Sequence, residues 1–338
     1  MPAPPIFKNP EHQKIFDKQG FVVTPLLNRD EVEYMDRLFD ELHKNLSDSG
    51  FHSGSYSSDM AYKRKVSEEI KRVFRRAYEE TFQNYTPFGG AYLYKIPSPN
   101  SDLFLHQDWT IVDESRYVAV NVWTPLCDIT EDNGPLMVLP GSHYDNFPVL
   151  RAPTMRYFFD HDYEVVLRQL IPMIVPAGTA VILNQSLVHY SPPNTSDKIR
   201  KAITAGVKTK DAQMIFHFKD PNRKDNLIEK FEMDDEFLIH FENFFEDIYK
   251  RPKVGKSLGF IEYEVPMLTG AALEDLVRKM KTSAGYKYIE QTAPTYQSKA
   301  QNTSQHETIN TSTPRQNLFK TYSPANILRE IKYRLTGR

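Results

Sequence analysis

The sequence has little cysteine and little net charge. Cys127 is the only cysteine among 338 residues, so an intramolecular disulfide and a zinc cluster built on thiolates are both excluded. Lys and Arg together number 42 and Asp and Glu number 44, which leaves a formal net charge of -2. A general nucleic-acid-binding protein is usually far more basic, so we expect no nucleic-acid partner.

Long apolar runs are also missing. The longest apolar stretch, residues 170–183, is too short to cross a bilayer and is interrupted by Pro172, Pro176 and Gly178. The N-terminal residues lack the basic start and apolar run of a signal peptide, so we expect a cytoplasmic location and no transmembrane segment. The 40% of hydrophobic residues still suffice for a sizeable core, which excludes disorder throughout.

Helical periodicity marks both flanks of the chain. Apolar residues at spacings of three and four predict amphipathic helices over about 30–46 and 66–84. Residues 226–250 are acidic and aromatic and also indicate a helix, which could form a lid, and a further helix is expected at about 270–282.

Between these flanks the chain consists of short β-prone runs. Pro, Gly, Asn and Asp separate the runs, as is typical of turns. Eight short strands with turns between them favour a sandwich or a barrel, and hence a mainly β fold with flanking α-helices. The expected strands are Ala91–Ile96, Leu103–Trp109, Tyr117–Pro125, Leu136–Leu139, Ile171–Val175, Thr179–Leu183, Lys201–Lys208 and Met214–Phe218.

The C-terminal part differs in composition from the rest. Residues 290–322 are rich in Thr, Ser, Gln and Asn, which predicts a flexible linker. A basic amphipathic segment, Pro324 to Arg338, follows, and a solvated tail helix, a contact with a membrane surface and docking to a partner all stay open for it. We therefore divide the chain into an N-terminal helical flank (1–88), a β core (89–220), a C-terminal helical flank (221–289) and a linker ending in a basic helix (290–338).

Two His-x-Asp pairs stand out, although one such pair arises easily by chance. His106 and Asp108 lie two residues apart in an expected strand, so both side chains point to the same face. A second histidine would complete the two-His, one-carboxylate face that holds Fe(II) and leaves positions open for substrate and oxygen. His189 is the best candidate, because it follows an expected strand across a short turn. The other pair, His143 and Asp145, follows a strand-ending turn, where we expect a structural role.

Arg200 and Ser191 suggest a co-substrate that carries carboxylates. Arg200 opens the strand after His189 and can point into the barrel, where a buried guanidinium needs a carboxylate partner. Guanidinium and carboxylate pair through two parallel hydrogen bonds, and the Ser191 hydroxyl can supply a third. 2-Oxoglutarate would chelate the metal through its C1 carboxylate and keto oxygen and would place its C5 carboxylate against Arg200. Taken alone, an arginine is more often part of a surface salt bridge.

Several runs of residues occur together in an order typical of one enzyme family. They are Phe16-Asp-Lys-Gln-Gly20-Phe-Val-Val, Lys95-Ile-Pro97, His106-Gln-Asp108, Asn121-Val-Trp123-Thr-Pro125-Leu, Asn133-Gly-Pro-Leu136-Met-Val-Leu-Pro140-Gly-Ser-His143, and the run from His189 to Ile203. Each run is weak, but their joint occurrence is specific. Over residues 16–218 the chain resembles the phytanoyl-CoA dioxygenase family of iron- and 2-oxoglutarate-dependent oxygenases.

The resemblance implies a fold, a set of ligands and a reaction. The implied fold is a double-stranded β-helix, a jelly roll like that of the cupins, with flanking helices. The implied reaction uses Fe(II), O2 and 2-oxoglutarate to hydroxylate an unactivated C–H bond, with decarboxylation of 2-oxoglutarate to succinate. The implied iron ligands are His106, Asp108 and His189, and the implied 2-oxoglutarate contacts are Ser191, Arg200 and Trp123.

The chain departs from the family at one co-substrate contact. Some relatives place a methionine against 2-oxoglutarate where Ala91 stands here, so we expect Tyr94 or Tyr92 to replace that contact. The family's upstream lysine contact has no evident counterpart.

The substrate is the least determined part of the prediction. Gln107, Trp109 and Thr110 flank the ligands and are the candidate contacts for a small-molecule or acyl substrate. Because Asp108 is present, hydroxylation is favoured over halogenation, since related halogenases carry a small residue in its place. Two alternatives stay open: a catalytically silent β-barrel binding module, and a cupin-like metal enzyme that does not use 2-oxoglutarate.

Overall fold

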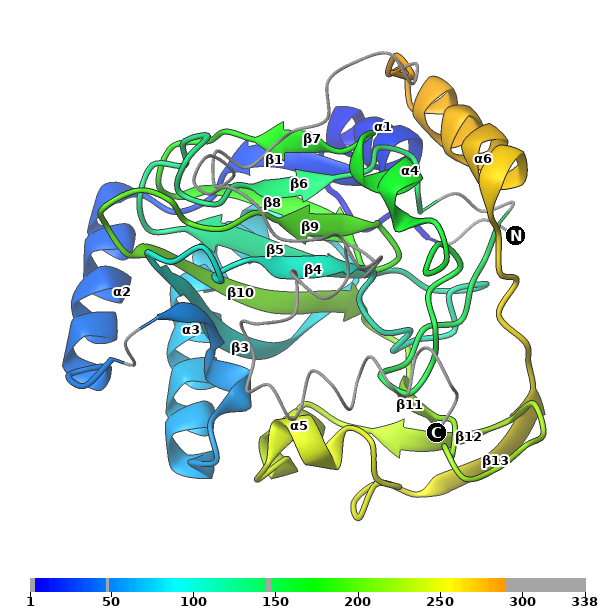
Figure 1. Ribbon diagram of the computed structural model, residues 1–338. Coiled ribbons are helices and arrows are strands. Elements are labelled where there is room, and N and C mark those ends of the chain that lie inside the picture. The colour runs from blue at the N-terminus through cyan, green and yellow to red at the C-terminus, as the bar shows by residue number, and fades with distance from the viewer. Residues whose placement is uncertain (1–3, 47–48, 144–146, 290–338) are drawn as a thin grey trace, which may run out of the picture.

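Two antiparallel β-sheets face each other at the centre of the computed structural model, which describes residues 4–46, 49–143 and 147–289 (Figure 1). The larger sheet has the strand order β1-β8-β5-β10-β3-β2, and the smaller sheet has the order β4-β9-β6-β7. The strands are β1 (Phe21–Pro25), β2 (Gly50–Ser53), β3 (Tyr85–Ile96), β4 (Leu103–His106), β5 (Ala119–Pro125), β6 (Leu136–Val138), β7 (Ile171–Met173), β8 (Thr179–Asn184), β9 (His189–Ser191) and β10 (Arg200–Thr209).

The order of the strands identifies the core as a double-stranded β-helix. From β3 to β10 the chain passes back and forth between the two sheets, and all pairings are antiparallel. The result is a flattened eight-stranded barrel, to which β1 and β2 add as outer strands of the larger sheet. The predicted mainly β jelly-roll fold is therefore confirmed, and seven of the eight expected strands lie in the barrel with ends that differ by up to six residues. The eighth, Met214–Phe218, belongs to a separate sheet, and β9 was not among the expected strands.

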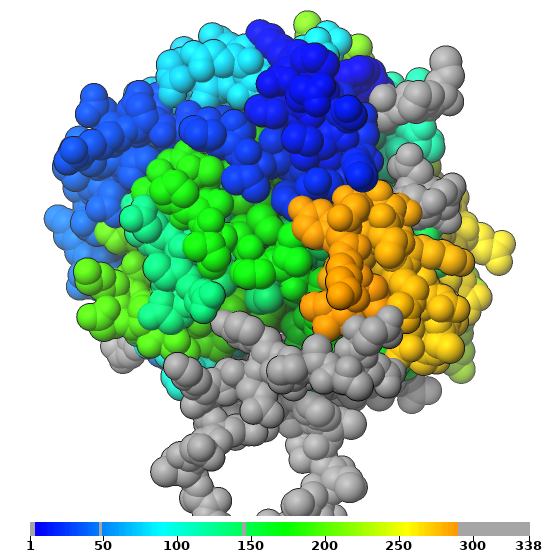
Figure 2. All heavy atoms as spheres, turned by 90° about the horizontal axis from the view of Figure 1, so that it is seen from above, coloured from blue at the N-terminus to red at the C-terminus, as the bar shows by residue number. Residues whose placement is uncertain are grey.

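Helices cover the outer faces of both sheets. The helices α1 (Pro10–Gln19), α2 (Arg29–Leu42) and α3 (Met60–Thr81) pack on the larger sheet through one shared apolar cluster. The smaller sheet packs against α4 (Tyr163–Leu167) and α6 (Gly270–Ser283). In Figure 2 α6 lies beside the N-terminal segment, although the two are far apart in the sequence.

Local sequence signals account for the helices that begin the chain. Asn28 caps α2 in a capping box with Glu31, and the buried Met35, Leu38 and Phe39 recur at helical spacing. Helix α1 ends at Gly20, which adopts φ +85° and turns the chain into β1. The expected helices over 30–46 and 270–282 are confirmed, and the one expected over 66–84 begins earlier, at residue 60.

Strand alternation decides which side chains face the space between the sheets. On β5, Val120 and Val122 pack under the helices, whereas Asn121 and Trp123 line the interior. At one end of the barrel the interior is filled by an apolar cluster from both sheets, among them Val138 and Val181. The polar site described below occupies the remaining interior.

The region after the barrel is not the long helix that the sequence suggests. A three-stranded sheet forms from β11 (Met214–Phe218), β12 (Leu227–Met233) and β13 (Ser257–Glu262), so the prediction of a helix over 226–250 is wrong. The short helices η2 (Phe237–His240) and α5 (Phe244–Asp247) follow β12 and lie beside this sheet (Figure 1). β12 contains a single aromatic residue, Phe231, and its pairing with both neighbours satisfies its backbone groups. The helically spaced aromatic residues lie after β12, in and around η2 and α5.

None of the helices in the described ranges is both long enough and apolar enough to span a membrane. The expected linker and basic helix over 290–338 lie outside the described residues.

Candidate active site

Two histidines face each other across neighbouring strands. His106 ends β4 and His189 begins β9, and the two residues are direct partners in the strand register. Their rings lie 4.1 Å apart between centroids. Each Nδ1 lies at hydrogen-bond distance from a backbone carbonyl, that of Phe104 (2.7 Å) and that of Leu187 (2.9 Å). A carbonyl accepts only, so Nδ1 carries a proton in both rings, and Nε2 is the nitrogen that could bind a metal.

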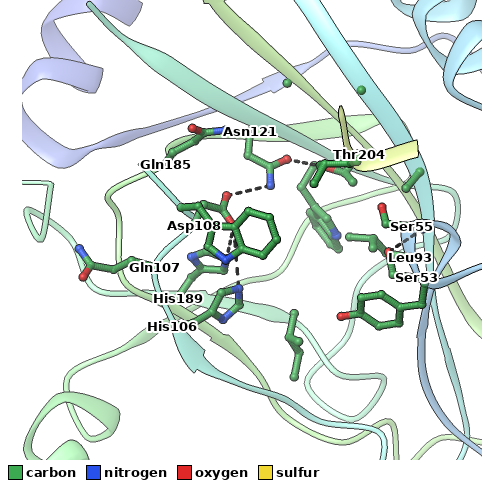
Figure 3. A pocket seen from close by; sticks show the side chains of 18 of the residues that line it. Ser53, Ser55, Leu93, His106, Gln107, Asp108, Asn121, Gln185, His189 and Thr204 are labelled. Carbon is green, nitrogen blue, oxygen red and sulfur yellow. Dashed lines mark hydrogen bonds and ion pairs between the residues drawn. The ribbon is translucent and has the colours of Figure 1, made fainter. Parts of the chain in front are cut away.

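Asp108 completes a three-residue group. Its Oδ1 lies 3.9 Å from Nε2 of His106 and 3.9 Å from Nε2 of His189 (Figure 3). One ligand atom of each residue lies within 4.8 Å of the others, a spacing that suits a common metal ion. The group offers two imidazoles and one carboxylate on one face, as non-haem Fe(II) sites do. Of the described residues, no other group of three His, Cys, Asp or Glu side chains has this spacing.

Asp108 does not lie in a strand, contrary to the sequence-based expectation. Strand β4 ends at His106, so the shared face of alternating strand residues does not explain why the two side chains converge. Instead, a residue from a distant segment holds the loop that follows β4: Nε of Arg151 donates to the Asp108 carbonyl at 2.8 Å. The buried Arg151 guanidinium also pairs with the Glu114 carboxylate. A charge-assisted clamp therefore replaces strand geometry as the cause of convergence.

A second network fixes the carboxylate of Asp108. Nδ2 of Asn121 donates to Oδ2 of Asp108 at 3.1 Å, and the Thr204 hydroxyl donates to Oδ1 of Asn121 (Figure 3). The Asp108 carboxylate settles the orientation of the amide, because a carboxylate only accepts and must face the amide NH2 group, which leaves the amide oxygen toward the Thr204 hydroxyl. Oδ2 is thereby engaged, and Oδ1 is left toward the histidines. Sequence reasoning missed Asn121, Thr204 and Arg151 in these roles, and the only available signal was the position of Asn121 two residues before Trp123.

Arg200 lies in the same cavity without a carboxylate partner. Its side chain is buried, with only 3% of the residue exposed. Nε and Nη1 have no hydrogen-bond partner among the described residues. Its guanidinium carbon lies 5.7 Å from the ring centroid of Trp123. Burial lowers the pKa of Arg200 to about 10, so the group remains cationic at neutral pH. An unsatisfied buried cation beside a candidate metal site fits the distal carboxylate of a keto-diacid.

A second cation lies next to Arg200. Lys95 pairs with Arg200 in the register of β3 and β10 and is completely buried. Its Nζ donates to the carbonyl of Ser191 at 2.9 Å and to that of Pro192. Burial, and then the charge of Arg200, holds the pKa of Lys95 well below its usual value. Sequence reasoning did not assign Lys95, although a lysine in a run as apolar as Tyr92-Leu-Tyr-Lys-Ile96 was a usable signal.

Some expected contacts line the cavity and others do not. Gln107, Trp109, Trp123 and Ser191 line it, and Ser191 donates its hydroxyl hydrogen to the carbonyl of Gly134 (3.0 Å).

Tyr94 and Thr110 lie elsewhere, and their expected contacts are corrected. Tyr94 faces the helices, where it packs against Phe39 and His43, because it sits on the outer face of β3. Leu93, its neighbour, lines the cavity instead. The Thr110 backbone N–H donates to the Arg151 carbonyl, and the Thr110 hydroxyl oxygen accepts from the Arg151 backbone N–H.

His143 lies apart from the three-residue group. Its Nε2 is 3.1 Å from the carbonyl of Asp17, and its ring lies against Phe16 on α1. A side chain at Gly20 would collide with it, since a Cβ there would lie 2.5 Å from Nδ1 of His143. This position agrees with the structural role expected for a residue at a strand-ending turn.

Several known proteins match part of the chain. Rice "Phytanoyl-CoA dioxygenase 1" is 28% identical over 118 residues, which are 34% of this chain and 42% of that protein. Zebrafish "Phytanoyl-CoA dioxygenase domain-containing protein 1" is 31% identical over 120 residues, 33% of this chain and 41% of that protein. The chain thus matches less than half of the length of either relative. "L-proline trans-4-hydroxylase" of Streptomyces griseoviridis is 32% identical over 100 residues, 24% of this chain and 37% of that protein.

Solved structures with low sequence identity also match. The α-ketoglutarate-dependent carbocyclase SnoK from nogalamycin biosynthesis matches with a TM-score of 0.47 and 18% identity, over 61% of this chain and 86% of that one. HygX from Streptomyces hygroscopicus, solved with nickel and 2-oxoglutarate, matches with a TM-score of 0.44 and 20% identity, over 59% and 86%. The family model "Phytanoyl-CoA dioxygenase (PhyH)" matches residues 16–202, more than half of the chain. The chain belongs to the phytanoyl-CoA dioxygenase family.

Proposed function

We propose that this protein is an Fe(II)- and 2-oxoglutarate-dependent dioxygenase that hydroxylates an unactivated C–H bond of a small-molecule or acyl substrate. In the overall reaction the substrate C–H group, O2 and 2-oxoglutarate become a substrate C–OH group, succinate and CO2. One observation carries the proposal: a group of two histidines and one aspartate with metal-ligand spacing shares a cavity with Arg200, a buried cation that has no carboxylate partner among the described residues.

Each part of the chain then has a defined role. His106, Asp108 and His189 hold the metal, and Arg200 binds the C5 carboxylate of 2-oxoglutarate beside Trp123. When bound, Fe(II) supplies the oxygen chemistry that couples decarboxylation of 2-oxoglutarate to hydroxylation. The surrounding protein orients Asp108, keeps the cavity poor in water and positions the C–H bond.

The donor set fits these two ligands. Nδ1 of each histidine lies at hydrogen-bond distance from a backbone carbonyl, so Nε2 is the ring nitrogen that would bind the metal. The C5 carboxylate would neutralise Arg200 in a buried place where an unpaired charge is costly. The cytoplasmic location stays a prediction.

The test combines anaerobic binding with aerobic turnover. Purified protein free of metal is titrated with Fe(II) and 2-oxoglutarate under nitrogen, and the charge-transfer absorption of an Fe(II)–keto-acid complex is followed. Air is then admitted, and succinate is measured by mass spectrometry; we expect slow succinate formation even without substrate.

Two outcomes would contradict the proposal. A protein that binds the metal and 2-oxoglutarate but forms no succinate, with or without a substrate panel, would be the silent binding module. A metal-dependent activity that survives in Arg200→Ala would indicate a cupin-like enzyme that does not use 2-oxoglutarate.

A further inference from the structure

The cavity beside the three-residue group is small and largely apolar. Its volume is about 330 Å³, near the lower end of the range of roughly 300–1,000 Å³ for ligand cavities. Of the described residues that line it, the side chains that can carry a charge are His106, His189, Asp108 and Arg200. The proposed function assigns all four to the metal and 2-oxoglutarate. A charged group of the substrate would therefore find no counter-charge on the remaining walls.

Among the residues that line the cavity, four aromatic side chains form one contiguous cluster, which we call the aromatic wall: Tyr56, Trp109, Phe244 and Phe245. The Tyr56 ring lies 4.7 Å from that of Phe244 and 4.7 Å from that of Phe245. The ring of Trp109 is stacked with that of Phe244 at 6.2 Å and an interplanar angle of 11°. The wall thus brings together a turn next to β2, the loop after β4, and α5.

Two residues of the aromatic wall lie outside the part of the chain that matches the family model. The family match ends at residue 202, whereas Phe244 and Phe245 belong to α5. This segment is tied to α3, because the buried Lys63 donates from Nζ to the carbonyls of Phe241 (2.7 Å) and Leu238 (3.4 Å). Phe237 and Phe241 anchor it further by packing against Phe216 on β11. Residues beyond the family match therefore shape this side of the cavity.

We infer that the part of the substrate that enters this cavity is an uncharged, mainly apolar ring system that packs against the aromatic wall; the inference rests on the proposed function. Aromatic side chains bind flat ring faces through stacked or edge-on contacts. The cost of burying an unpaired carboxylate, ammonium or phosphate excludes free amino acids and a nucleotide carrier from the cavity itself. The cavity must also hold 2-oxoglutarate, so only a small reacting part of the substrate fits inside.

A matched pair of probes tests the charge requirement. N-phenyl-1-naphthylamine and 8-anilinonaphthalene-1-sulfonate share one ring skeleton, but only the second is anionic. Both are titrated by fluorescence with Mn(II) and saturating 2-oxoglutarate bound, so that Arg200 is occupied. We expect the neutral probe to bind about tenfold or more tightly than the anionic probe. Equal affinities would overturn the inference.

Matched variants test where the probe binds. Phe244→Ala should weaken binding of the neutral probe several-fold, whereas Phe260→Ala should not, since Phe260 is 52% exposed on β13 and does not line the cavity. Phe245→Lys should shift the preference toward the anionic probe. Equal loss in Phe244→Ala and Phe260→Ala would place the probe on the surface and overturn the inference.

A third comparison tests the requirement for rings. 2-Naphthol and the linear decan-1-ol are both neutral, and each is used to displace N-phenyl-1-naphthylamine. We expect that displacing the same fraction of the probe needs about a tenfold higher concentration of decan-1-ol than of 2-naphthol. Equal potency would overturn the requirement for rings.

Succinate formation, measured on the same protein loaded with Fe(II) in place of Mn(II), separates the two proposals. Succinate without probe discrimination would reject the inference alone, whereas discrimination without succinate would reject the proposed function and leave the cavity's ligand class standing.

Discussion

The two ends of the active-site cavity are built from different kinds of contact. At the metal end, charged and hydrogen-bonding groups hold one another in fixed directions, as Arg151 holds the Asp108 carbonyl and Asn121 holds the Asp108 carboxylate. At the aromatic wall, rings from distant segments meet through shape, and Phe244 and Phe245 approach Tyr56 without directed polar bonds of their own in this contact. The comparison suggests that the first end fixes the reaction and the second selects the substrate.

The largest effect is expected for a metal ligand. His189→Ala removes one of three ligands and should abolish detectable Fe(II) binding, because two ligands hold the ion poorly. A ligand that binds only the folded protein stabilises it by about 2.7 kcal/mol at one hundred times its dissociation constant, so the thermal shift caused by metal should vanish. His143→Ala should keep that shift, and an equal loss in both variants would contradict the assignment of ligands.

Arg200 is expected to give the next largest effect, confined to 2-oxoglutarate. Arg200→Ala should weaken 2-oxoglutarate binding on the order of 30- to 5,000-fold, the equivalent of about 2–5 kcal/mol for truncating a buried charge partner. Metal binding without 2-oxoglutarate should stay as in the wild type. Lys201→Ala is the control, because its side chain points outward to Asp36 and Asp40. Calorimetry would measure the affinities for the metal and for 2-oxoglutarate. A loss of 2-oxoglutarate affinity in Lys201→Ala would contradict the argument that only the inward-pointing Arg200 binds the co-substrate.

The network behind Asp108 should give an intermediate effect. Asn121→Ala leaves the carboxylate free to rotate and should weaken metal binding about 10- to 100-fold, as loss of an outer hydrogen bond to a ligand does. Thr204→Val should act in the same direction but less, since it removes only the donor that orients Asn121. Thr124→Val is the matched control, because the Thr124 hydroxyl has no hydrogen-bond partner among the described residues. Co(II) titration measures all three, and an unchanged affinity in Asn121→Ala would contradict the positioning role.

The metal end was also the more predictable of the two. His106, Asp108, His189 and Arg200 were predicted because each carries a chemical requirement that sequence spacing and family order restrict, and all four line one cavity. The reason why the His106 and Asp108 side chains converge could not be predicted, because the hydrogen bond from Arg151 to the Asp108 carbonyl joins residues 43 positions apart. Spacing alone also failed for Tyr94, because a one-residue step along a strand reverses the face on which a side chain lies.

The aromatic wall was less predictable because its residues fit a second pattern. Phe244 and Phe245 of the wall recur at helical spacing with the preceding Phe237 and Phe241, and nothing in the sequence indicated that β12 would pair with β11 and β13. Local periodicity is a weak constraint where long-range strand pairing competes with it. The prediction of a lid in this region stays untested, whereas its place beside the cavity follows from the lining residues.

The smallest expected effect concerns the tie between the wall and α3. Lys63→Met keeps the length of the side chain but removes the donor to the Phe241 and Leu238 carbonyls, at a cost of about 1–3 kcal/mol for the buried groups left unpaired. Hydrogen exchange over 237–249 should accelerate, and N-phenyl-1-naphthylamine should bind a few-fold more weakly. Arg64→Met loses only an exposed ion pair with Glu236 and should change neither. Because Lys63 contacts neither the metal ligands nor Arg200, the affinities for Co(II) and 2-oxoglutarate should stay constant; if they fall together with probe binding, the two ends of the cavity are not independent.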